Sequence, residues 1–139
     1  MAPTYIDERG NQVPGAPFGK PVTGVPTDLG QLYESARNCM RVGACASAAL
    51  TCRKILMHVA VNKGAEPGKN FTDYVTHLAE KNYIPQGATE WVDLIRRQGN
   101  HANHEIWMPE RREAEDLLYF TQMLLTFVYE IPARLPKKA

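Results

Sequence analysis

The residues best suited to do chemistry lie in one stretch, from Arg96 to Glu105, which combines guanidinium, amide, imidazole and carboxylate groups. Its candidate site residues are Arg96, Arg97, Asn100 and His104, with His101 and Glu105 adjacent to them. Arginine offers a rigid fork of donors that suits phosphate or carboxylate, and histidine exchanges protons near neutral pH. A helix that continued through the stretch would place Arg97, His101 and His104 on one face, with Asn100 beside them. We therefore expect these groups to converge at one point.

The composition is that of an ordinary single domain. The chain has 139 residues, of which 44% are hydrophobic and 22% charged, and its formal net charge is +1. Between Glu90 and Asp116 the acidic residues outnumber the arginines, which argues against tight, non-specific binding of nucleic acid. The sequence shows no signal peptide and no apolar run long enough to span a membrane. We expect a cytoplasmic protein with no membrane partner.

The three cysteines are Cys39, Cys45 and Cys52. They are odd in number and lack the C-x-x-C spacing of metal-binding or redox pairs. All of them fall in segments with helical spacing. The sequence therefore predicts buried free thiols in a reducing compartment.

Residues 1–26 differ in composition from the rest of the chain. They hold half of the chain's 10 prolines and show almost no periodic apolar pattern. This predicts an extended or disordered N-terminal arm, with a turn at Arg9-Gly10-Asn11. Such an arm could be ordered by a partner.

About five helices are predicted from apolar spacing and from start and stop residues. They are expected from 27 to the stop at Gly43, over 44–62, after the cap Asn70, from Thr89 into the polar stretch, and from 109 to 131. Thr27 or Asp28 is expected to cap the first helix. Pro109 fits the first position of the last helix, and Pro132 is expected to stop it. The fold class is therefore all-α.

The last predicted helix is apolar on more than one side. One seam is formed by Leu117, Phe120, Leu124, Phe127 and Ile131, and the apolar surface is widened by Leu118, Met123, Leu125 and Val128. A helix of this kind is either central to a bundle or shared with a second subunit. We favour self-association, and expect a homodimer.

Several short motifs lie along the predicted helices. They are Pro26-Thr27-Asp28-Leu29, Tyr33-Glu34-Ser35-Ala36, Ala48-Ala49, Cys52-Arg53-Lys54-Ile55-Leu56 and Ile95-Arg96-x-x-Gly99-Asn100-x-x-x-His104-Glu105. Over roughly residues 26–132 the chain resembles domain-of-unknown-function family 4145. That family occurs mostly in bacteria and phages, alone or fused to defence proteins, and is similar to the HEPN superfamily. The resemblance implies a HEPN-like bundle over 27–132, followed by a tail at 133–139.

Many HEPN proteins are metal-independent ribonucleases whose arginine and histidine act across a dimer interface. The resemblance implies His104 as acid or base and Arg96 or Arg97 on the phosphate, with Asn100 orienting a partner. The motif of those nucleases is Arg-x(4–6)-His, and the spacing of Arg97 to His104, or of Arg96 to His101, fits it. Arg96 to His104, the pair in the uncharacterised family, is one residue longer.

The same residues also fit a structural interpretation. In a buried or interfacial polar network, Asn100 would satisfy free backbone groups and Arg53 would pair with Glu105. His101-x-x-His104-Glu105 lacks the spacing of H-E-x-x-H, so we expect no metal and no cofactor.

The leading hypothesis is a HEPN-like interaction or regulatory module in prokaryotic or phage nucleic-acid conflict, with a protein partner. The alternative is a metal-independent endoribonuclease acting on RNA. A nucleotide-binding module is the third hypothesis.

Overall fold

The computed structural model of the chain describes residues 5–6, 12–13, 15, 18–104 and 108–136, and only the backbone at residues 5, 12–13 and 99–104. The helices are α1 (Thr27–Arg41), α2 (Cys45–Asn62), α3 (Phe71–Glu80), the 3-10 turn η1 (Gln86–Ala88), α4 (Thr89–His104), α5 (Arg111–Leu125), the π-helical η2 (Thr126–Glu130) and α6 (Ile131–Arg134). Two short antiparallel strands, β1 (Tyr5–Ile6) and β2 (Gln12–Val13), precede them. The predicted all-α bundle is confirmed.

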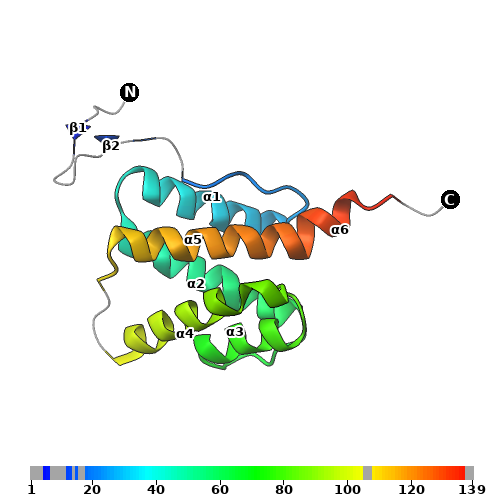
Figure 1. Cartoon of the computed structure of the whole chain (residues 1–139). Helices are drawn as coiled ribbons and strands as arrows, with labels where there is room; N and C mark the ends of the chain where they lie inside the picture. The colour runs from blue at the N-terminus through cyan, green and yellow to red at the C-terminus, as the bar shows by residue number, and fades with distance from the viewer. Residues whose placement is uncertain (1–4, 7–11, 14, 16–17, 105–107, 137–139) are drawn as a thin grey trace.

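The helices surround α2, which contacts α1, α3 and α5. In Figure 1, α1 and α5 lie side by side over α2, and α3 and α4 lie on its other side. The face of α2 is built from small and branched side chains, all fully buried: Ala48, Ala49, Cys52, Ile55, Leu56, Val59 and Ala60. The alanines let neighbouring backbones approach closely, and the larger side chains fill the remaining space.

The helix starts agree with the sequence in part. The Asn70 side chain caps α3 by accepting a hydrogen bond from the Asp73 amide at 2.9 Å, as predicted. The expected cap at Thr27 or Asp28 is wrong, because Pro26 holds the N-cap position and no side chain caps α1. The Asp28 carboxylate instead accepts from the neighbouring Leu29 amide.

The start of the last helix was also misplaced. Pro109 lies outside α5, which begins at Arg111. Glu110 is its N-cap and forms a capping box with Glu113, whose carboxylate accepts from the Glu110 amide at 3.1 Å. The reciprocal cap sets the start of the helix two residues after the proline.

The predicted stop at Pro132 is wrong as well. The helix passes through η2 into α6, where Pro132 stands in the first turn and its missing N–H costs little. The π-helical turn and the end of α2 at Asn62 also change which side chains are covered. Phe127 is 38% exposed and Ile131 50% exposed, while Val128 is buried, so the predicted seam fails at its C-terminal end.

The apolar breadth of α5 has an explanation within one chain. Leu117, Leu118, Leu124 and Leu125 are all buried. α5 contacts α1, α2 and α4, so it is one of the central helices. The homodimer stays a prediction.

The N-terminal arm is extended in its described part. Residues 18–26, here called the strap, run along α1 in the opposite direction and end beside the α5–α6 junction (Figure 1). Phe18, Val22 and Val25 are partly buried against the core. The turn predicted at 9–11 lies outside the described residues.

The three thiols are free, but they differ in burial. Cys52 is fully buried, whereas Cys39 and Cys45 are partly exposed, so the expectation of buried thiols holds only for Cys52. Burial raises the pKa of the Cys52 thiol to about 12. Over the described residues, none of the helices has both the length and the apolar character needed to cross a membrane.

Candidate functional site

The predicted polar stretch lies on the second half of α4, whose helical backbone continues to His104. This register places positions 97, 101 and 104 along one side of the helix. The side chains of Asn100, His101 and His104, and the whole of Glu105, lie outside the described residues. The two arginines are therefore the candidates whose positions the structure gives.

Arg96 is partly buried on the side of α4 that faces α3. One of its terminal nitrogens lies 3.9 Å from an Asp93 carboxylate oxygen. The side chain lines a pocket of about 340 Å³ between α3, η1 and α4. The remaining lining residues are Ala79, Glu80, Asn82, Ile84, Pro85, Gln86, Thr89, Val92 and Asp93. The pocket is mixed in charge, since it holds one guanidinium and two carboxylates.

Arg97 is exposed and turned back along its own helix. Its Nε donates to the carbonyl oxygen of Asp93 at 3.4 Å. Both described arginines are thus associated with Asp93, Arg96 with its carboxylate and Arg97 with its backbone. Neighbouring helix positions diverge by about 100° around the axis, so the two guanidinium groups form no joint clamp.

Two polar atoms on this part of α4 are buried and have no hydrogen-bond partner among the described residues. They are the Nε of Arg96 and the Oε1 of Gln98. A buried polar atom without a partner is costly, and it commonly marks a place where water or a ligand binds. These two buried atoms of α4 therefore retain hydrogen-bonding capacity that the described residues do not use.

Arg53 on α2 was predicted to join the same polar network. Its guanidinium carbon lies 4.4 Å from the ring centroid of Phe71, at the start of α3. Burial lowers the pKa of Arg53 below its ordinary value. The predicted partner Glu105 lies outside the described residues. Among the residues that are described, no three His, Cys, Asp or Glu side chains gather as they would around a metal ion.

A second polar cluster, which the sequence reasoning missed, lies on α1 and holds the strap. Arg37 is 9% exposed and donates to the carbonyl oxygens of Phe18 at 2.9 Å and Gly19 at 3.1 Å. Its third nitrogen binds both carboxylate oxygens of Glu34, at 3.0 and 3.1 Å. The guanidinium thereby joins two carbonyls of the strap to one carboxylate of α1.

Further side chains extend this cluster. The buried Tyr33 hydroxyl donates to the Lys20 carbonyl oxygen, and burial raises the pKa of Tyr33 well above its ordinary range. From α5, the side-chain Oε1 of Gln122 accepts from the Lys20 amide at 2.9 Å. The signal in the sequence was Arg37 itself, a long cation between apolar positions of the first predicted helix.

The strap is tied at its far end by Glu130 of η2. One carboxylate oxygen accepts from the Thr23 amide at 2.8 Å and from the Thr23 hydroxyl at 2.9 Å. These hydrogen bonds to the backbone and side chain of Thr23 lower the pKa of Glu130, and the charge of Arg134 lowers it further.

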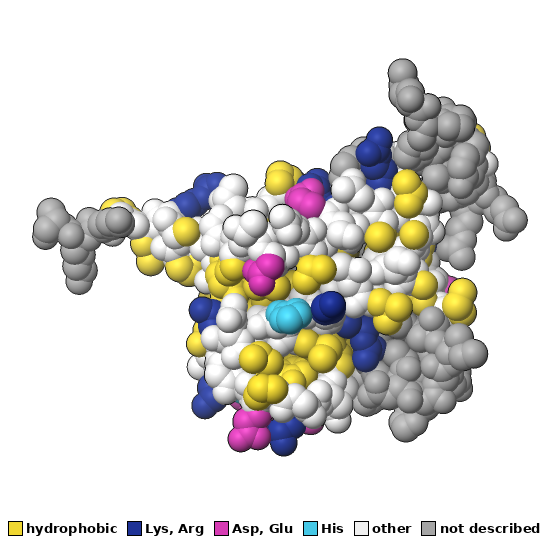
Figure 2. Space-filling view, turned by 180° about the vertical axis from the view of Figure 1, so that it is seen from behind, with side chains coloured by type: hydrophobic (Ala, Val, Ile, Leu, Met, Phe, Trp, Pro, Cys, Tyr) yellow, Lys and Arg dark blue, Asp and Glu magenta, His cyan; other side chains and the backbone are white. Residues whose placement is uncertain are grey.

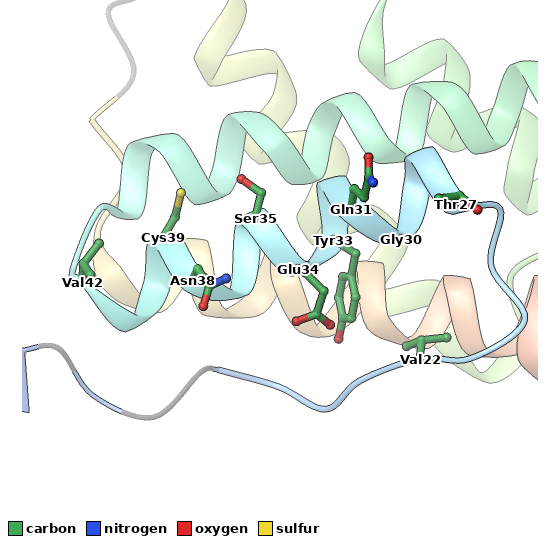
Figure 3. Close-up of a pocket in the computed structure, with 10 residues that line it drawn as sticks. All are labelled: Val22, Thr27, Gly30, Gln31, Tyr33, Glu34, Ser35, Asn38, Cys39 and Val42. Atoms are coloured by element: carbon green, nitrogen blue, oxygen red, sulfur yellow. The ribbon is translucent and has the colours of Figure 1, made fainter. Parts of the chain in front are cut away.

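An open groove of about 860 Å³ runs along the exposed side of α1, with Val22 of the strap on its edge (Figure 3). Its lining is Val22, Thr27, Gly30, Gln31, Tyr33, Glu34, Ser35, Asn38, Cys39 and Val42. In Figure 3 the strap follows the length of α1 beside these side chains. Most of the groove's surface is apolar, and its polar side chains carry amide, hydroxyl and carboxylate groups.

Comparison with known proteins gives one match. The family described as a domain of unknown function (DUF4145) matches residues 34–139. No curated protein and no solved structure matches the chain. The matched segment covers most of the chain, from the middle of α1 through α6, and it includes the polar stretch of α4 and the strap-holding residues Arg37, Gln122 and Glu130. The chain therefore belongs to the DUF4145 family.

Proposed function

We propose that this protein is a HEPN-like helical interaction or regulatory module that acts in prokaryotic or phage nucleic-acid conflict. The observation that carries the interaction role is the pair of buried polar atoms on α4, Arg96 Nε and Gln98 Oε1, which have no partner among the described residues. Both atoms are buried, so a partner would satisfy them by inserting a group beside α4 that supplies an acceptor for Arg96 and a donor for Gln98. The resemblance to defence-associated relatives supports the setting.

The charge distribution supports a protein partner over a polyanion. The acidic Asp93 offsets Arg96, and Arg97 is directed back to the Asp93 carbonyl. Among the described side chains on the face seen in Figure 2, cationic and anionic groups are scattered between small hydrophobic groups and form no basic patch. Tight phosphate binding generally needs a cluster of cations.

Gln98 offers a direct test of the interaction role. We expect Gln98→Leu to leave the melting temperature unchanged or to raise it, because it removes a buried polar atom that has no partner among the described residues. Thermal unfolding followed by circular dichroism would measure this. Gln122→Leu is the matched control and should destabilise the fold, since Gln122 accepts from the Lys20 amide. A drop of several degrees for Gln98→Leu would make Gln98 a structural residue and remove the main support for the proposal.

A second candidate function is a metal-independent endoribonuclease. One observation favours it: α4 is continuous to His104, so positions 97 and 104 lie along the same side of the helix. In that mechanism His104 would move a proton at the ribose 2′-hydroxyl or the leaving oxygen, while Arg97 would stabilise charge on the phosphate.

Structured RNA incubated in EDTA with purified protein distinguishes the two functions. The interaction module predicts no cleavage by the wild type. The nuclease predicts cleavage that survives chelation and is lost in His104→Ala and Arg97→Ala. His58→Ala is the matched control, because His58 is an exposed histidine on α2. Cleavage with that pattern would refute the first proposal as the whole function.

A further inference from the structure

The strap is held almost entirely through its main chain. The bundle donates to the carbonyl oxygens of Phe18 and Gly19 from Arg37, and to that of Lys20 from Tyr33. Gln122 and Glu130 accept from the amides of the strap. The one side-chain hydrogen bond to the bundle from a described strap residue is that of the Thr23 hydroxyl. This is how peptide-binding domains hold extended ligands: main-chain bonds give affinity, and pockets for a few side chains give specificity.

The strap also has the shape of a closely fitted ligand. Gly19 and Gly24 have φ values of +73° and +75°, which L side chains rarely adopt. A Cβ at Gly19 would lie 2.8 Å from the side-chain Oε1 of Gln122. One at Gly24 would lie 3.0 Å from the Ala133 Cβ and 3.2 Å from the Tyr129 carbonyl oxygen. The backbone thus approaches α5, η2 and α6 closely at two positions where the positive φ values would strain any residue other than glycine.

Apolar contacts complete the fit. The Phe18 ring meets the Tyr119 ring edge to face, with centroids 4.7 Å apart. Val22 and Val25 pack against the core. Toward its C-terminal side the strap joins the bundle at a single point, because α1 begins directly after Pro26. The residue before a proline is restricted to extended conformations, so Val25 favours an extended strap whether it is bound or released.

We propose that the strap-holding face of α1 and α5 is a binding site for an extended peptide, and that it accepts the strap of a second copy of this chain in place of its own. The second strap fits because it has the same residues, including the two required glycines. To exchange straps, two chains need a different backbone conformation only around Pro26. Swapping an identical element between protomers therefore costs little free energy. This inference does not rest on the polar residues of α4.

A synthetic peptide of residues 15–27, labelled with fluorescein, can represent the second strap. The host is the full-length chain with Gly24→Ala, which weakens its own strap. Gly30→Ala is the matched control, since a Cβ there meets nothing within 4 Å. Fluorescence anisotropy should show saturable binding of one peptide per Gly24→Ala chain. Binding to the wild type and to Gly30→Ala should be weaker by about tenfold or more, because their own strap occupies the site.

Two further variants define the site. Adding Arg37→Ala to Gly24→Ala should abolish peptide binding, and a peptide carrying Gly19→Ala should not bind. Should Gly24→Ala fail to fold, Glu130→Ala opens the strap from the surface by removing both bonds to Thr23. Faster hydrogen exchange at the Lys20 amide shows that the strap has opened in either variant.

The exchanged form itself can be measured by light scattering. Wild-type protein annealed at high concentration should contain a dimer fraction, and excess peptide should convert that fraction to monomer. An opened variant that binds no peptide would overturn the proposal. A dimer that excess peptide leaves intact would overturn the exchange.

Discussion

Arg37 on α1 and Arg96 on α4 have the same spacing to a carboxylate in their own helix, but their distances to it and their burial differ. Each follows a carboxylate by three residues, Glu34 in the first case and Asp93 in the second. The guanidinium–carboxylate distance is 3.0 Å for Arg37 and 3.9 Å for Arg96, and the exposed fractions of the arginine side chains are 11% and 36%.

The difference comes from the strap, a segment that belongs to neither helix. It covers Arg37 and supplies two carbonyl acceptors, so that the guanidinium is buried and satisfied. No comparable segment among the described residues covers Arg96, and its Nε has no partner there. Spacing along a helix therefore determines which charges can pair. Whether the pair is structural depends on what packs over it.

The largest expected effect is on removal of Arg37. Arg37→Ala leaves the carbonyls of Phe18 and Gly19 without their donor, so we expect a loss of about 2–3 kcal/mol in the free energy of unfolding. Arg96→Ala removes a long, partly exposed ion pair and should cost less than about 1 kcal/mol. Urea denaturation of both variants measures this difference. Equal losses would contradict the comparison.

Removal of a single hydroxyl group should lower the free energy of unfolding by less than removal of Arg37. Tyr33→Phe removes the donor to the Lys20 carbonyl and should cost about 1 kcal/mol. Tyr74→Phe is the matched control, since its hydroxyl donates to the Glu66 carbonyl and accepts from the Lys69 amide, away from the strap. Both variants should unfold more readily in urea. Only Tyr33→Phe should speed hydrogen exchange in the strap, and an equal response in Tyr74→Phe would show that the exchange reports global stability.

The smallest effect is a dependence on pH at the far end of the strap. The folded-state pKa of Glu130 is lowered by the hydrogen bonds from Thr23, with a further contribution from Arg134. Its stabilising contribution is therefore complete above the ordinary pKa of about 4.5 and is lost as the pH falls through the lower folded value. Exchange at the Thr23 amide, corrected for the intrinsic rate, should increase over that range. Glu130→Gln should show no such increase.

Much of the fold could be predicted from the sequence. Apolar spacing and local stop residues placed α2, α3 and the start of α4, since those signals are local. The wrong helix ends are those at which contacts made by other residues outweighed the local preference of a proline. The reciprocal cap of Glu110 and Glu113 overrode Pro109, and η2 carried the helix through Pro132.

The two candidate sites also differ in how far the sequence predicts them. The polar stretch on α4 is visible in the sequence because its residues are neighbours along the chain. The strap cluster is not, because Arg37, Gln122 and Glu130 are brought together only by folding. The strap's glycines and prolines predict only an extended or disordered arm. Their main-chain groups make the contacts, and those groups are the same in every sequence.

The strap is a bound element of the fold, and amide hydrogen exchange is the sharpest test of that binding. The Lys20 and Thr23 amides lie in an extended segment without helix or sheet bonds, yet they donate to Gln122 and Glu130. We predict that both amides are protected in the wild type and lose that protection in Arg37→Ala, while Arg96→Ala leaves it unchanged. Exchange of these amides at the unprotected rate in the wild type would contradict the account.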